Sequence, residues 1–352
     1  MISATVQDQL WAAVLAGDEY AAAATALAAI DAGMTPEDVL LDVVAPVQCR
    51  IGAEWAANRL SVTEEHSATA INDRVIATLA HHPAHRGDEE AGRVTVACVD
   101  GEWHVLPARL LAEVLRLRGW RVDFLGAQVP TPHLIAHLHR HGPDAVALSC
   151  SIPSRLPLAH AAITACQAAG VSVLAGGAAF GPQGRYAFQL GADGWAPDAR
   201  GAADVLRRGL RPARTFGGQQ FDFGLPHLAD QEYTFVNETA AELVRATVAE
   251  LTHCIPDMQS YSDFQRQNAT VDVAHTVDFL AAALYTDDDE LFERFIAWTA
   301  GILTARGVSA LVLARSLEVL AVRLHDFPRA RRILCNALST LAQPATDPSL
   351  MP

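Results

Sequence analysis

The stretch RVTVACVDGEWHVLP, residues 93–107, decides the fold of this chain. Apolar and β-branched residues over Val94–Val99 predict a buried strand, and Pro107 is well placed to begin a helix. The short loop between them carries Glu102 and His104. Strand-helix units of this kind build parallel sheets, which bind ligands at the carboxyl ends of their strands. An acid and a histidine two residues apart are therefore expected at a ligand-binding edge.

The same alternation continues to about residue 209. Four more short apolar runs predict strands at Val122–Leu125, Ala145–Ser149, Val171–Leu174 and Asp193–Ala196. Helical segments follow the strands at Pro107–Arg118, Pro132–Arg140, Leu158–Ala169, Arg185–Leu190 and Arg200–Arg208. Five such repeats predict a flavodoxin-like, five-stranded parallel sheet with helices on both faces, which we assign to a domain of residues 89–212.

The segment ahead of the sheet is helical throughout. Turn signals occur at Gly17-Asp18 and Ala32-Gly33, and Ser61 with Glu64 forms a capping box that opens a last helix. Residues 1–88 are therefore expected to form a four-helix bundle.

The segment behind the sheet begins with a linker rich in Pro, Gly and Gln over residues 213–230. Helical patterns then recur near 231–252, 270–285, 288–305, 309–324 and 328–342. Residues 231–352 predict an all-α domain, for which a globin-like shape is one option. The chain is therefore expected to combine α and α/β domains.

Composition excludes several classes of function. The 352-residue chain has a formal net charge of −14 and no lysine, which argues against a nucleic-acid partner. No apolar run reaches the roughly 20 residues of a membrane span. The six cysteines are scattered, without a CxxC pair or a secretory leader, so we expect a cytoplasmic protein without disulfides.

The loop around His104 resembles the D-x-H-x-x-G motif of the cobalamin-binding domain, written here as E-x-H-x-x-P with Pro107 in the last position. The resemblance implies that His104 is the lower axial ligand of cobalt, in place of the cofactor's own benzimidazole, and that Glu102 hydrogen-bonds its other ring nitrogen. A carboxylate in that position fixes the tautomer of a metal-bound imidazole and raises its basicity.

Further features occur in the order that this family has. The segment Leu190–Gly194 matches the family's motif that follows the fourth strand. The resemblance also assigns five more residues to the cobalamin site. They lie at or after the ends of the second, third and fourth strands: Val129, Ser149, Ser151, Gly176 and Gly177. Ser149 would meet the buried benzimidazole tail, and the two glycines would let that tail pass close to the backbone.

In the helical segment ahead of the sheet, Trp55 and the Glu65-His66 pair read W-x9-E-H, with Val62 between them. This resembles the helical cap of cobalamin-dependent photoreceptors, in which such residues enclose the upper 5′-deoxyadenosyl group of adenosylcobalamin. The family's transcriptional regulators have a histidine directly after the tryptophan, where this chain has Ala56. His66 is then the candidate for an imidazole ligand after illumination.

The domain order resembles the photocobilins, whose C-terminal part holds biliverdin. A bilin needs apolar walls, cations for its propionates and polar partners for its nitrogens. Tyr261, His275, Tyr285 and Arg315 are the candidate bilin contacts.

These patterns favour a light sensor rather than an enzyme. We expect a light-dependent homo-oligomer or a separate effector protein as the output of the switch. One alternative is a corrinoid methyl-carrier protein of a methyltransferase system. Another is a cobalamin sensor whose last domain binds haem or a partner.

Overall fold

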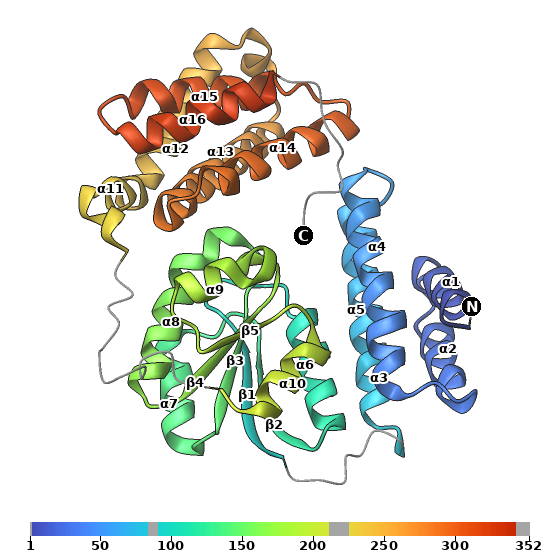
Figure 1. Cartoon of the computed structure of the whole chain (residues 1–352). Helices are drawn as coiled ribbons and strands as arrows, with labels where there is room; N and C mark the ends of the chain where they lie inside the picture. Colours follow the sequence, from blue (N-terminus) through green and yellow to red (C-terminus); the bar gives the residue numbers. More distant parts are fainter. Residues whose placement is uncertain (1, 84–90, 211–224, 343–352) are drawn as a thin grey trace. The chain divides into compact units, whose positions relative to one another are not determined.

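The computed structural model describes residues 2–83, 91–210 and 225–342 (Figure 1). The chain divides into two compact units, residues 1–223 and 224–352, and each is described by itself. The domain limits predicted at residues 88, 89 and 212, and most of the predicted linker over 213–230, lie outside the described residues. No described helix is long and apolar enough to cross a membrane.

The first unit begins with the predicted helical region. Its helices are α1 (Ile2–Leu15), α2 (Glu19–Asp31), α3 (Pro36–Val39), the π-helix η1 (Leu40–Val44), α4 (Ala45–Ala56) and α5 (Val62–Ala80). The residues that join α3, η1 and α4 keep helical backbone angles, so residues 36–56 form one continuous helix. The predicted capping box of Ser61 and Glu64 at the start of α5 is confirmed, with N···O distances of 3.2 and 2.7 Å.

Pro46 explains the π-turn inside this long helix. Proline has no N–H, so it cannot donate to the carbonyl four residues earlier, that of Asp42. Side chains of α1 donate to this carbonyl instead, from Gln7 Nε2 at 2.6 Å and Ser3 Oγ at 2.9 Å. These two hydrogen bonds connect the irregular helix to α1.

The five-stranded parallel sheet is confirmed. Its strands are β1 (Gly92–Cys98), β2 (Trp120–Gly126), β3 (Ala145–Ser149), β4 (Ser172–Gly176) and β5 (Gly194–Ala196), all within two residues of the predicted positions. The helices are α6 (Leu106–Leu117), α7 (Thr131–His141), α8 (Leu156–Ala168), α9 (Arg185–Gln189) and α10 (Ala199–Arg208), with 3-10 turns η3 (Pro153–Arg155), η4 (Ala178–Phe180) and η5 (Pro182–Gly184).

The strand order is β2-β1-β3-β4-β5, the flavodoxin-like order. In this register Cys98 pairs with Ser149, and Ser149 pairs with Gly176. The carboxyl ends of β1, β3 and β4 therefore lie side by side, and the loops that follow them start from one edge of the sheet.

The helical bundle and the sheet share a hydrophobic core. One continuous cluster of buried residues includes Leu40 and Ile76 of the bundle, Leu110 and Val114 of α6, and Val96 of β1. Because the shared core excludes water between the bundle and the sheet domain, the bundle packs against α6 in a defined position.

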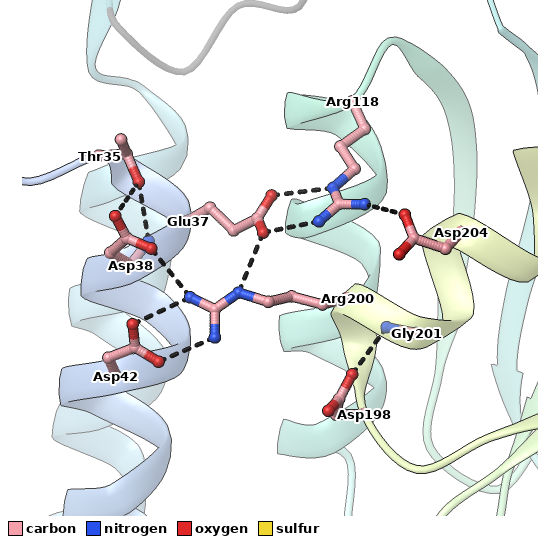
Figure 2. Close-up of polar contacts among 9 residues, drawn as sticks. All are labelled: Thr35, Glu37, Asp38, Asp42, Arg118, Asp198, Arg200, Gly201 and Asp204. Atoms are coloured by element: carbon pink, nitrogen blue, oxygen red, sulfur yellow. Dashed lines mark hydrogen bonds and ion pairs between the residues drawn. The ribbon is translucent and has the colours of Figure 1, made fainter.

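Ion pairs beside this core also join the bundle to the end of α6 and to α10 (Figure 2). Arg118, at the end of α6, donates to both carboxylate oxygens of Glu37 at 3.0 and 2.8 Å. Arg200 of α10 donates to Glu37 at 3.2 Å, to Asp38 at 2.9 Å and to both oxygens of Asp42 at 2.9 Å. We call these five residues the arginine latch. Hydrogen bonds from the two arginines hold the pKa of Glu37 below its ordinary value, and that from Arg200 does the same for Asp42.

The second unit is helical, as predicted. It contains η6 (Pro226–Asp230), α11 (Glu232–Glu238), α12 (Ala240–Cys254), η7 (Pro256–Ser260), α13 (Asp263–Thr286), α14 (Asp289–Ala305), α15 (Leu311–Arg323) and α16 (Pro328–Leu341). Two predicted boundaries were wrong. The helix predicted over 231–252 is two helices separated at Thr239, and α13 starts at Asp263 rather than near residue 270, because Ser262 and Gln265 form a capping box.

Replacing Arg200 with methionine is expected to lower the free energy of unfolding of the first unit by about 1 to 2 kcal/mol at neutral pH, because the bundle carboxylates lose a shared, partly exposed cation. Glu37 and Asp42 have lowered pKa values in the folded chain. The stabilisation is therefore present above their ordinary pKa values and is lost as the pH falls through the lowered ones.

Urea titrations from neutral to acid pH would measure this difference, which should shrink in acid. Arg207→Met is the matched control, since Arg207 is an exposed residue of the same helix. Equal losses in both variants would contradict a role for the latch.

Candidate functional site

The site is built around the Glu102 carboxylate, whose side chain is fully buried at the carboxyl edge of the sheet. Its Oε2 accepts hydrogen bonds from the backbone N–H groups of Ser151 at 2.6 Å and Ile152 at 3.1 Å, in the loop after β3. Its Oε1 accepts from the backbone N–H of His104 at 2.8 Å. One carboxylate therefore ties the loop after β1 to the loop after β3.

The fourth partner of this carboxylate is the imidazole of His104. Nδ1 of His104 lies 2.7 Å from Oε1 of Glu102. Since an ionised carboxylate only accepts hydrogen bonds, Nδ1 carries a proton, and in the neutral imidazole the lone pair is therefore on Nε2. The His104 side chain is 58% exposed, so Nε2 is within reach of a ligand. The structure thus forms the acid-histidine pair that the sequence predicts.

Electrostatics at the pair follow from these bonds. The hydrogen bond with Glu102 raises the pKa of His104, and the charge of Glu65 on α5 adds to the increase. Burial acts to raise the pKa of Glu102, but the hydrogen bonds from His104 and Ser151 outweigh it, so the pKa of this carboxyl is lowered.

Neighbouring loops complete the edge. The backbone N–H of Gln128 donates to the carbonyl of Glu102 at 3.0 Å, and that of Val129 donates to the carbonyl of Cys98 at 3.3 Å. Val129 is buried, as is Ser149 at the end of β3. Pro107 lies in the first turn of α6, so the residue that departs from the family's glycine starts a helix here.

The two glycines after β4 have different surroundings. At Gly176 the nearest atom to an added Cβ would be the carbonyl oxygen of Ala196 at 3.8 Å, which leaves room beside the backbone. Gly177 has a φ of +101°, and its Cβ would lie 2.3 Å from the carbonyl oxygen of Cys150. The chain's own backbone therefore requires glycine at 177, a reason that the sequence did not reveal.

The residues predicted for the upper ligand lie around one end of the α4–α5 hairpin. Trp55 is half-buried in the last turn of α4, and Val62, the first residue of α5, is 53% exposed. Glu65 and His66 meet, with Oε2 and Nδ1 2.6 Å apart. Oε1 of Glu65 accepts from the hydroxyl of Thr69 at 2.9 Å, a partner that sequence reasoning missed although it lies one helical turn away.

The four bilin candidates of the second unit are spread out. Tyr261 packs on a small apolar cluster that also contacts Val312 of α15, and Arg315 of α15 is exposed and paired with Glu318 at 2.5 Å. His275 is an exposed residue in the middle of α13. Tyr285 lies at the far end of this helix, with its ring 4.7 Å from that of Tyr233.

Helix length sets the distance between the two tyrosines. A rise of about 1.5 Å per residue separates the ends of the 24-residue α13 by roughly 35 Å. The structure therefore groups Tyr261 with Val312 of α15 and does not bring Tyr285 to that group.

Comparison with known families defines the class of this site. Residues 92–204 match a family described as a B12 binding domain, and residues 6–80 match a second family with the same description. The chain thus carries B12-binding domains, which support a cobalamin cofactor.

Particular proteins are similar to parts of this chain. The chain is 34% identical over 121 residues to the HTH-type transcriptional repressor CarH of Myxococcus xanthus, a match that covers 34% of this chain and 38% of that protein. The chain therefore spans less than half the length of this curated relative. The monomethylamine corrinoid protein of Methanosarcina barkeri has a similar fold, with a TM-score of 0.51 and 18% identity over 58% of this chain and 98% of its own.

Gly177→Ala should lower the free energy of unfolding by about 2 kcal/mol or more, because its Cβ would collide with the backbone of Cys150 at a left-handed φ. Gly176→Ala is the matched control and should unfold like the wild type, since its Cβ meets only an ordinary contact. Thermal unfolding of the two variants without cofactor would measure the difference. Equal stability of the two proteins would refute the backbone requirement at 177.

Proposed function

We propose that this chain is a light sensor that binds adenosylcobalamin between the sheet edge and the helical bundle, with His104 as the lower axial ligand. The observation that carries the proposal is the Glu102–His104 pair, with Nδ1 held at 2.7 Å from the carboxylate and Nε2 left to bind a metal. When bound, adenosylcobalamin supplies a cobalt–carbon bond that light can break.

The donor set of the site suits this cofactor. A corrin ring already gives cobalt four equatorial nitrogens, so the protein has to contribute only an axial one. Among the described residues, no three His, Cys, Asp or Glu side chains come together as a bare metal ion would need. A single imidazole oriented by a buried carboxylate is therefore the appropriate protein ligand.

The opposite face has suitable groups for an adenosyl ligand. Trp55 offers an apolar wall, and the charged Glu65 can accept hydrogen bonds from ribose hydroxyls. A methyl ligand would offer no hydroxyl group to donate a hydrogen bond to Glu65. Loss of the adenosyl group would remove its contacts with Trp55 and Glu65, and this would shift the bundle toward another arrangement.

We propose further that the helical unit holds biliverdin. Tyr261 beside α15 supplies an apolar wall, and Arg315 supplies a cation for a propionate. The output of the switch is a change in self-association or the binding of a separate effector protein in the cytoplasm, with no nucleic-acid partner.

Illumination of the chain loaded with adenosylcobalamin tests the proposal. We expect the cobalamin absorption bands to change, because the upper ligand of cobalt is lost. We also expect the elution volume in size-exclusion chromatography to shift, because loss of this ligand changes how the bundle packs against the sheet domain. Protein loaded with hydroxocobalamin, which lacks a cobalt–carbon bond, is the control and should show neither change.

Two results would contradict a light sensor. The first is that neither the absorption bands nor the elution volume change on illumination. The second is equal affinity for methylcobalamin and adenosylcobalamin, which would favour a methyl-carrier protein. A red absorption band on addition of biliverdin would support the bilin, and its absence would remove the bilin from the proposal.

A further inference from the structure

A chain of polar side chains runs between α4 and α5 of the bundle and ends at Glu65. Nδ2 of Asn72 donates to Oε1 of Gln48 at 2.8 Å, and Nε2 of Gln48 donates to Oγ1 of Thr69 at 2.7 Å. Oγ1 of Thr69 then donates to Oε1 of Glu65 at 2.9 Å. We call Asn72, Gln48 and Thr69 the bundle relay.

The relay has a direction. An ionised carboxylate accepts hydrogen bonds and cannot donate them, so the chain of donors must end at Glu65. Gln48 donates to the Thr69 hydroxyl, which leaves the proton of that hydroxyl to point at the carboxylate. The relay therefore holds one oxygen of Glu65 in place, while the other oxygen lies 2.6 Å from Nδ1 of His66.

Thr69 differs in this respect from two other threonines inside helices of the bundle. Thr25 and Thr78 donate to the backbone carbonyl four residues earlier, at 2.8 and 2.9 Å, as helical threonines commonly do. Thr69 donates instead to the side chain of the residue four positions earlier. Its hydroxyl is therefore engaged by Glu65 and Gln48 and not by its own helix backbone.

Burying the polar groups of the relay costs free energy of folding. Asn72 is fully buried, and its Oδ1 has no hydrogen-bond partner among the described residues. Positions 65, 69 and 72 share one face of α5, where aliphatic side chains would avoid the cost of desolvating amide groups. The unpaired oxygen of Asn72 adds to this cost. The relay ends at Glu65, so its physical effect is to be sought in the position of that carboxylate.

We infer that Thr69, Gln48 and Asn72 are positioning residues that hold the Glu65 carboxylate for the ribose hydroxyls of the upper cobalamin ligand. This inference rests on the proposed binding of adenosylcobalamin. A carboxylate that is charged and fixed at one oxygen loses little conformational freedom when a ligand hydroxyl donates to it, and the bond is correspondingly stronger. The relay thus sets the preference for a hydroxyl-bearing upper ligand over a methyl group.

The test is to measure the dissociation constants of adenosylcobalamin and methylcobalamin, in the dark, for Thr69→Val. This change keeps the shape of the side chain and removes the hydroxyl. We expect about a tenfold weaker affinity for adenosylcobalamin, as for the loss of one bond to a charged group, and little change for methylcobalamin. Thr69→Ser should restore the preference, and Thr78→Val, on the same helix, should leave both constants unchanged.

Equal changes for both cobalamins in Thr69→Val, or no change for either, would overturn the inference while the wild type still prefers adenosylcobalamin. A wild type without that preference would instead overturn the proposed function and the relay with it. Gln48→Met provides a second measurement in case Thr69→Val folds poorly. It removes the donor to Thr69 and should also reduce the preference for adenosylcobalamin.

Discussion

The buried Glu102 carboxylate is the interaction on which the candidate site depends. It accepts hydrogen bonds from Ser151, Ile152 and His104, and so it joins loops that follow two different strands. A carboxylate buried without such partners would be strongly destabilising. The parallel register provides the geometry, because it sets Cys98 beside Ser149 and brings the two loops to the same edge. The orientation of His104 is therefore a consequence of how the sheet pairs.

The bundle carries the other half of the proposed site, and its packing against α6 and α10 has two physical causes. The shared core on α6 supplies apolar contact without direction, and the arginine latch supplies directional bonds at α3 and η1. Glu65 lies on α5 and is not one of the latch residues. Its charge contributes to the raised pKa of His104. A change at the upper ligand would thus act on a bundle that is held by contacts outside the site.

Local signals made much of this structure predictable. The strand ends, the helix start at Pro107 and the Ser61–Glu64 cap depend on residues a few positions apart, and the Glu102–His104 contact spans two. The missed features join residues distant in the sequence. Gly177 is constrained by Cys150, and Gln48 reaches Thr69 from another helix. Such contacts become visible only when the packing of the elements is known. For the bilin candidates, composition could name suitable side chains but could not tell that α13 separates two of them.

The most direct test of the central claim is electron paramagnetic resonance of the chain loaded with unlabelled cob(II)alamin, after growth on 15N-histidine. An axial nitrogen splits the cobalt signal, and the nuclear spin of that nitrogen sets the number of lines. Coordination by His104 predicts a doublet pattern in the labelled wild-type protein, since 15N has spin one-half. A triplet, which is the pattern of the cofactor's own unlabelled benzimidazole, would contradict the account.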